Sequence, residues 1–249
     1  MEISEPCVRF LAKKAHIAPI YKMAKGEKMF KTELHCHSKS VSECASVSNE
    51  EIIQKYTEAG YKTLVLSNHF NYGTQCFHKC VNDYQAFVTA YLKGYEDLKR
   101  DAEGKLIVLL AMELRFKENS NDYLVFGIDE KFLRENEGLF DLNPESFSKI
   151  ARENGLLFVQ AHPFRNSMKI VRPDLLDGVE VYNGHKGHDS RNEIANLWAE
   201  KYGLIKTSGT DFHYNHVPAN AGIRTEYEIK SMEELIKTLK DGTYELIRE

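Results

Sequence analysis

The chain has 249 residues, of which 42% are hydrophobic and 28% charged, and a formal net charge of −4. This balance excludes a disordered chain and gives no general attraction to nucleic acid or to anionic lipid. Any phosphate-bearing ligand must therefore meet a local group of cations, and nucleic acid is not the partner we expect.

The 5 cysteines are odd in number and scattered, which is typical of reduced thiols in a cytoplasmic protein: Cys7, Cys36, Cys44, Cys76 and Cys80. No run approaches the ~20 apolar residues of a membrane span, and Lys13, Lys14 and His16 interrupt any signal-peptide core. We predict a cytoplasmic location and no membrane partner. Residues 1–28 are interpreted as an N-terminal extension and residues 29–249 as one domain.

Short apolar or β-branched runs alternate along the chain with stretches of helical period. The predicted strands are Phe30–His37, Thr63–Ser67, Leu106–Leu114, Tyr123–Gly127, Leu156–Ala161, Gly178–Val181, Ile205–Ser208 and Tyr244–Ile247. Capping chemistry marks the helix starts between them: Ser48 with Glu51, Asn143 with Pro144, Ser190 with Glu193, and Ser231 with Glu234. Seven or eight such units without a glycine-rich fingerprint favour a single α/β barrel with a mostly parallel sheet.

Polar residues follow several of these strands where each one ends. His35 and His37 share one face of the first strand, so both can bind one metal ion. His69 comes just after the second strand. Glu113 follows a very hydrophobic run and needs a cation, either a metal ion or one of the neighbours Arg115 and Lys117.

Two later strands end in the same way. His162 and Arg165 follow one of them, and Asp211 and His213 follow another at a spacing that points both side chains one way. A structural surface rarely gathers seven potential ligands at the carboxyl ends of five strands, so we predict a metal site at the barrel mouth. Asn183 and His185 follow a further strand; they either face the substrate or make ordinary loop hydrogen bonds.

These motifs resemble the PHP (polymerase and histidinol phosphatase) superfamily from about Lys31 to the C-terminal strand. The matching segments are His35-Cys36-His37, Ser67-Asn68-His69, Glu113, Ala161-His162-Pro163-Phe164-Arg165 and Ser208-Gly209-Thr210-Asp211-Phe212-His213. The resemblance implies a distorted (β/α)7 TIM-like barrel that binds two or three divalent ions, Mn, Fe or Zn, and hydrolyses phosphate esters.

By position, the resemblance implies that His35, His37, Glu113 and Asp211 hold the first metal, that Glu113 and His162 hold the second, and that His69 and His213 hold the third. Arg165 resembles a phosphate clamp. The sequence departs from the family at Ser42 and Glu43, where a further ligand is usual; Glu43 has the chemistry to replace it. It departs again around Asp122, where a histidine is often found.

We therefore interpret the chain as a phosphoric monoester hydrolase, similar to histidinol phosphatases, that acts on histidinol phosphate, a nucleotide or a sugar phosphate. In this hypothesis a metal-activated hydroxide near Glu113 and Asp211 attacks phosphorus, Asp211 also accepts a proton, and Arg165 holds the phosphate. The alternatives are an amidohydrolase-type metal hydrolase and a catalytically inactive metal-binding domain.

Overall fold

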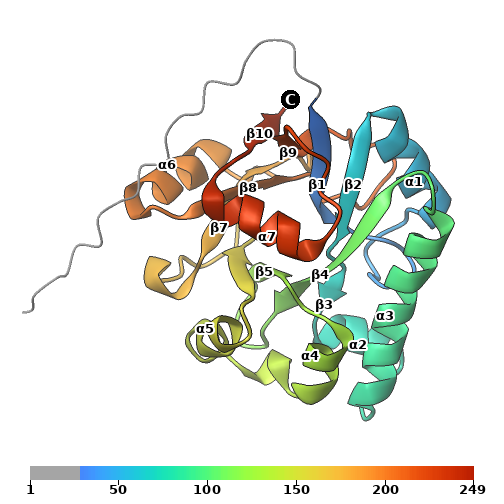
Figure 1. The fold of residues 1–249 in the computed structure, drawn as a ribbon. Coiled ribbons are helices and arrows are strands. Elements are labelled where there is room, and N and C mark those ends of the chain that lie inside the picture. Colours follow the sequence, from blue (N-terminus) through green and yellow to red (C-terminus); the bar gives the residue numbers. More distant parts are fainter. Residues whose placement is uncertain (1–28) are drawn as a thin grey trace, which may run out of the picture.

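The computed structural model describes residues 29–249, which form one α/β domain (Figure 1). Its strands are β1 Phe30–Cys36, β2 Tyr61–Leu66, β3 His69–Phe70, β4 Ile107–Arg115, β5 Asp122–Phe126, β6 Leu157–Gln160, β7 Gly178–Asn183, β8 Ile205–Gly209, β9 Ala221–Thr225 and β10 Glu245–Arg248. Its α-helices are α1 Asn49–Glu58, α2 Tyr72–Phe77, α3 Tyr84–Asp101, α4 Glu130–Glu135, α5 Pro144–Glu153, α6 Asn192–Tyr202 and α7 Met232–Asp241.

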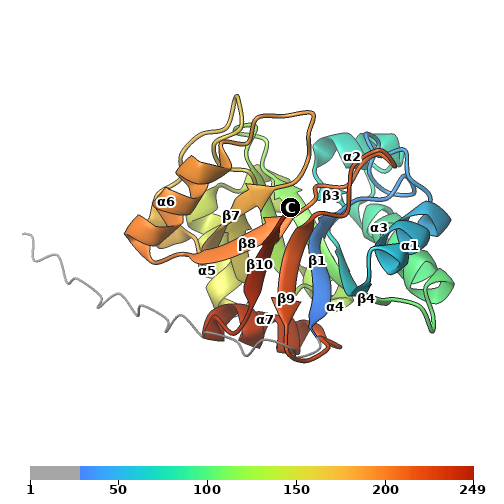
Figure 2. The ribbon, with the colours of Figure 1, turned by 90° about the horizontal axis from the view of Figure 1, so that it is seen from above.

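The strands form one sheet in the order β10-β9-β1-β2-β4-β5-β6-β7-β8, with β3 paired to β4. The sheet curls until β8 returns to β1, where Cys36 and Phe212 form a parallel bridge (Figure 2). The Ser208 hydroxyl donates to the carbonyl of Ile247 at 2.6 Å and accepts from the amide of Gly222 at 3.1 Å, which links β8 to β9 and β10. The predicted single, distorted α/β barrel is confirmed.

The prediction of a mostly parallel sheet needs a correction at β5, in the middle of the sheet. β5 runs antiparallel to both β4 and β6. Residues 116–121 join β4 to β5, and so short a connection permits a hairpin but not the helical crossover that a parallel pair requires. β9 was not predicted; it pairs antiparallel with β1 and β10.

Three of the four predicted helix starts are confirmed. Ser48 and Glu51 form a complete capping box at α1, and the Asn143 side chain accepts from the Ser146 amide ahead of Pro144 at α5. Ser231 caps α7 by accepting from the amide of Glu234. The fourth prediction, Ser190 with Glu193, is wrong, because α6 begins after Arg191.

Two apolar layers leave only one end of the barrel open. Inside the barrel, Leu34, Val65 and Ile223 pack with Leu235 and Leu239 of α7, which closes the amino ends of the strands (Figure 1). Outside it, α3, α5 and α6 pack against the opposite face of the sheet in one cluster, and α1 packs in a second. The carboxyl ends of the strands therefore remain as the accessible mouth.

The apolar residues of α6, Ile194, Leu197, Trp198 and Tyr202, have a helical spacing that is typical of a core face, but most of them do not lie in the core. Ile194, Leu197 and Tyr202 are exposed, whereas Trp198 packs partly against the core. Within residues 29–249, none of the helices combines the length and the apolar character that crossing a membrane requires.

Candidate metal centre

Seven polar side chains meet at the barrel mouth, as the strand ends predict. His35 lies on β1 and His37 directly after it. The others are His69 in β3, Glu113 in β4, His162 after β6, and Asp211 and His213 after β8. Six of the seven are buried, and His69 is the partly exposed one. Burial of so many titratable groups requires that they pair with one another or bind cations.

Glu113 is the centre of this cluster because four imidazoles contact its carboxylate. Its Oε1 lies 3.2 Å from Nε2 of both His35 and His162. Its Oε2 lies 2.7 Å from His69 Nδ1 and 3.5 Å from His37 Nε2. Burial opposes its ionisation, but the neighbouring imidazoles outweigh burial and hold the pKa of Glu113 well below its usual range.

The sequence left open a pairing of Glu113 with Arg115 or Lys117. The Arg115 guanidinium instead binds Asp122 through two hydrogen bonds of 2.6 and 2.7 Å. Lys117 Nζ pairs with Asp141 at 2.6 Å. The cationic neighbours in sequence are therefore occupied elsewhere, and imidazoles surround Glu113 in their place.

Asp211 is the second carboxylate of the cluster. Its Oδ1 lies 3.4 Å from Nε2 of both His35 and His37, and Asn183 donates to its Oδ2 at 3.2 Å. Both Asp211 (φ 51°) and His162 (φ 29°) adopt the left-handed backbone conformation, which is costly for residues other than glycine. Strain of this kind concentrates at functional sites. Here the two strained residues follow β6 and β8, and the backbone turn at each directs its side chain into the mouth.

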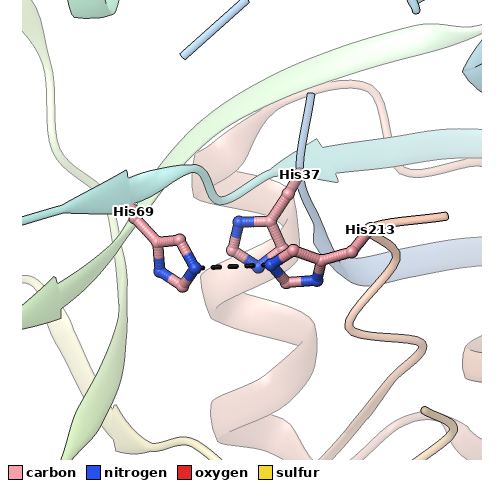
Figure 3. Close-up of side chains that lie close together, drawn as sticks. All are labelled: His37, His69 and His213. Carbon is pink, nitrogen blue, oxygen red and sulfur yellow. Dashed lines mark hydrogen bonds between the residues drawn. The ribbon is translucent and has the colours of Figure 1, made fainter. Parts of the chain in front are cut away.

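Three imidazoles form the outer part of the cluster (Figure 3). The Nε2 atoms of His69 and His213 lie 3.3 Å apart, and the ring of His37 stacks on that of His213 at a centroid distance of 4.1 Å. His213 Nδ1 contacts the carbonyl oxygen of Asp211 at 2.9 Å, which leaves its Nε2 directed toward His69.

The donor set fits divalent metal ions. Four groups of three side chains place one ligand atom each within 4.8 Å of one another: His35, His37 and Glu113; His35, His162 and Asp211; His37, His69 and His213; and His69, Glu113 and Asp122. Among the described residues, Nε2 of His35 and Nε2 of His37 are buried without a hydrogen-bond partner. Mixed imidazole and carboxylate donors suit Mn, Fe and Zn, and a bound ion would satisfy these atoms.

Two buried glutamates support the cluster from behind, and neither role was predicted from the sequence. Glu180 of β7 accepts from His35 Nδ1 at 2.9 Å and from the His162 amide at 3.0 Å. Glu33 Oε1 accepts from the amides of His35 at 2.8 Å and Thr210 at 2.9 Å, which joins β1 to β8. For Glu180 the available signal was a charged residue between two valines of a buried strand, which must face a polar partner.

A cavity of about 630 Å³ opens in front of the cluster. Its walls include Glu43, Arg165 and His185, three of the predicted site residues, together with His188. Glu43 is exposed and belongs to none of the candidate ligand groups found in residues 29–249.

Two other predicted residues are held close to Asp211. Arg165 reaches toward Asp211 and Asp122 at 3.5 and 3.6 Å. Asn183 is not among the residues that line the cavity. Its side-chain Nδ2 donates instead to the carboxylates of Glu180 and Asp211.

The PHP domain model matches residues 33–244, so the chain belongs to the PHP domain family. The match spans every strand end described above and confirms the resemblance drawn from the sequence motifs. A search among curated proteins finds no match.

Solved structures share the fold at low sequence identity. A two-domain protein from Bacteroides vulgatus ATCC 8482 that contains a PHP-like metal-dependent phosphoesterase is 14% identical, with a TM-score of 0.59 over 90% of this chain and 66% of that one. PsfC from Pseudomonas syringae PB-5123 is 12% identical, with a TM-score of 0.60 over 89% and 92% of the two chains. Endonuclease Q, bound to a 27-mer duplex with an abasic lesion at its active site, is 16% identical, with a TM-score of 0.59 over 86% of this chain and 57% of that one.

The chain thus spans just under two thirds of the Bacteroides protein and little more than half of endonuclease Q. The expectation that nucleic acid is not a partner is therefore not supported, because endonuclease Q, which shares this fold over part of its length, binds a DNA duplex as substrate.

Proposed function

We propose that this protein is a metal-dependent phosphoesterase that hydrolyses the phosphate monoester of a small metabolite. The observation that carries the proposal is the Glu113 carboxylate, fully buried and contacted by four imidazoles at the mouth of a barrel. Such a carboxylate is suited to bridge divalent ions. Membership of the PHP domain family supports the same reading.

Two or three ions fit the donors, with Mn, Fe and Zn all chemically suitable. The first would use His35, His37, Glu113 and Asp211; the second would use Glu113 and His162; the third would use His69 and His213. When bound, the ions supply water activation at neutral pH and neutralise phosphoryl oxygens, the two needs of phosphate ester hydrolysis.

The chain's own side chains then bind and orient the substrate. Arg165 presents a planar fork of donors at the cavity wall, which matches two oxygens of a phosphate. A phosphate that binds there competes for the guanidinium with Asp122 and Asp211, which contact it at 3.6 and 3.5 Å. We assign His185 to the substrate or its leaving group, since it lines the same cavity.

Asp211 and Asn183 act together in this proposal. The Asn183 amide donates to Asp211 Oδ2 at 3.2 Å, which fixes the orientation of the carboxylate. Asp211 is then placed to accept a proton on the side of the cavity. Asn183 supports Asp211 and does not contact the substrate directly.

A DNA phosphodiester is the second candidate substrate, favoured by the endonuclease Q complex. The formal charge of −4 weighs against it, because duplex binding relies on a broad cationic surface. An amidohydrolase activity and an inactive binding domain are the remaining alternatives. Glu113 stands where a bridging lysine would be expected in the first, and retention of all seven ligands argues against the second.

One assay panel separates these functions. Protein treated with EDTA and then loaded with Mn²⁺, Fe²⁺ or Zn²⁺ is tested on p-nitrophenyl phosphate, bis-p-nitrophenyl phosphate, an abasic DNA duplex and a simple amide. The proposal predicts metal-restored turnover that is highest on the monoester. His37→Ala should abolish it while circular dichroism stays unchanged. Preferential cleavage of the duplex or of the amide would reject the monoester assignment.

A further inference from the structure

The ion-pair partners of Arg165 hold its side chain only loosely. Its guanidinium nitrogens lie 3.5 Å from Asp211 and 3.6 Å from Asp122, whereas charge-assisted hydrogen bonds are about 2.7–2.9 Å long. Asp122 also accepts two short hydrogen bonds from Arg115, which are its stronger contacts. The direction in which Arg165 reaches is therefore set mainly by the loop after β6 that carries it.

Arg191, the residue before α6, holds this loop on both sides of Arg165. Its Nη1 donates to the carbonyl oxygen of Phe164 at 2.5 Å, and its Nη2 donates to Oδ1 of Asn166 at 2.6 Å. Phe164 and Asn166 are the chain neighbours of Arg165. The Phe164 ring also meets the ring of Trp198 in α6 edge to face, at a centroid distance of 6.0 Å. The loop that carries Arg165 is thus docked on the start of α6.

Arg191 has no place of its own in the cavity. It is not among the residues that line the cavity, whereas Arg165 is. Arg191 also ends the loop after β7, which carries the cavity residues His185 and His188. Its guanidinium therefore joins two loops of the cavity wall from behind, and any effect on a bound substrate must pass through them.

The start of α6 is locally unfavourable at Arg191. The residue has φ 48° and ψ 52°, the left-handed conformation that is costly for residues other than glycine. No side chain caps this end of the helix. The Ser190 hydroxyl, which has the chemistry of a cap, is buried and has no hydrogen-bond partner in residues 29–249. A strained and uncapped helix start points to a functional constraint, and the two hydrogen bonds of Arg191 supply one.

We propose that Arg191 is a positioning residue for the phosphate site, which directs Arg165 at the substrate without contacting the substrate itself. The inference rests on the assignment of Arg165 to the phosphate in the proposed function. The planar fork of one guanidinium reaches both acceptors at a fixed geometry, which the single ammonium group of lysine cannot reproduce. Without Arg191 the loop loses this fork, so Arg165 would meet the phosphate less often.

Titration of inorganic phosphate into the metal-loaded full chain, followed by calorimetry, measures the effect. Arg191→Ala should weaken phosphate binding on the order of tenfold, below the ~10²-fold that a 1 Å misplacement can cost. Arg191→Lys should recover little of the loss. Arg172→Ala removes an exposed arginine that pairs with Asp174, and it should bind phosphate as the wild type does.

Zn²⁺ affinity should stay unchanged in Arg191→Ala. The nearest candidate ligand in the chain is His162, whose amide is held separately by Glu180 at 3.0 Å. KM for p-nitrophenyl phosphate should rise in step with the loss of phosphate binding. A loss of Zn²⁺ affinity as large as the loss of phosphate affinity would contradict a role confined to Arg165.

Arg191→Gly separates positioning from stability, because glycine adopts the left-handed conformation without strain. This variant should resist urea at least as well as Arg191→Ala and lose phosphate affinity to the same extent. The double variant Arg165→Ala, Arg191→Ala should bind phosphate no more weakly than Arg165→Ala alone, since Arg191 acts only through Arg165.

Wild-type phosphate affinity in Arg191→Ala would overturn the proposal, as would a full further loss when Arg191→Ala is added to Arg165→Ala. In either case weak binding by Arg165→Ala alone would leave the phosphate site and the proposed function in place. Wild-type binding by Arg165→Ala, or a metal-loaded wild type that binds no phosphate, would overturn the phosphate site together with this inference.

Discussion

The Nδ1 of His35 donates a 2.9 Å hydrogen bond to Oε1 of Glu180, and both side chains are buried. This bond fixes the ring so that Nε2 points toward Glu113 and Asp211, at 3.2 and 3.4 Å. A carboxylate behind a histidine orients it for metal binding and raises its basicity. Glu180 is therefore a positioning residue for the candidate centre.

Glu180→Gln should weaken metal binding while the protein stays folded. The amide group of glutamine places an N–H opposite an existing donor, either His35 Nδ1 or the backbone amide of His162. Loss of such a support typically lowers metal affinity by about 10- to 100-fold. Calorimetric Zn²⁺ titration measures the change. Glu193→Gln, the same substitution at an exposed site on α6, is the control, and equal affinities in the two variants would refute the role.

Gly209→Ala should disturb the same support from the other side. A Cβ at Gly209 would lie 2.3 Å from His35 Cβ and 2.9 Å from Glu180 Oε1, so one of them must move. We expect a loss of stability of about 1–3 kcal/mol, the usual effect of overpacking, together with weaker metal binding. Urea unfolding and metal titration measure the two effects.

Gly203→Ala is the matched control, because its Cβ meets open space although its φ of 63° is also unfavourable for alanine. It should lose some stability and keep full metal affinity. A Gly209 variant that keeps full metal affinity would show that the close approach at β8 does not position His35.

Arg165→Ala should lower kcat/KM for p-nitrophenyl phosphate by on the order of 10²-fold, the usual effect of removing one donor to a charged transition state. Arg165→Lys should recover only part of the loss, since lysine keeps the charge and not the planar fork. Arg152→Ala, on the exposed side of α5, should have no effect. A fully active alanine variant would remove Arg165 from the proposed phosphate site.

Glu33 should make the stability of the metal-free protein depend on pH. Burial raises the pKa of Glu33 from its ordinary value of 4.5 to about 7, against the backbone amides of Thr210 and His35, which lower it. A raised pKa means that the folded state binds the proton more tightly than the unfolded state. The stabilisation is therefore complete below pH 4.5 and is lost as the pH rises through about 7.

Glu33→Gln removes this titration. Relative to the wild type, the variant should gain about 2–3 kcal/mol between pH 5 and pH 8, from 1.36 kcal/mol for each unit of pKa shift. Urea unfolding of both proteins in EDTA at the two pH values gives the difference. A difference that is the same at both pH values would contradict the raised pKa.

The sequence predicted the candidate ligands because they obey local rules. His35 and His37 alternate on one strand, and Glu113 and Asp211 follow apolar runs whose ends must meet in a barrel. The direction of β5 was not predictable in the same way, since it depends on the short connection after β4. Helical spacing alone also indicates a core position for Leu197, although its side chain is exposed in the structure.

The supporting residues required knowledge of tertiary contacts. Glu180 lies within β7, three residues before its end, and its partner His35 is 145 positions away. The local sequence pattern predicts which residues lie at the strand ends. The residues that support them depend on contacts across the barrel, which the local pattern does not contain.

The central claim is that the buried histidines and carboxylates assemble a metal centre that hydrolyses a phosphate ester. Metal content and phosphate release, measured on protein purified without chelator, then after EDTA, then after metal is restored, test it most directly. We expect two or three divalent ions per chain, and phosphate release that EDTA abolishes and added metal restores. Protein that binds no metal, or whose phosphate release is indifferent to EDTA, would contradict it.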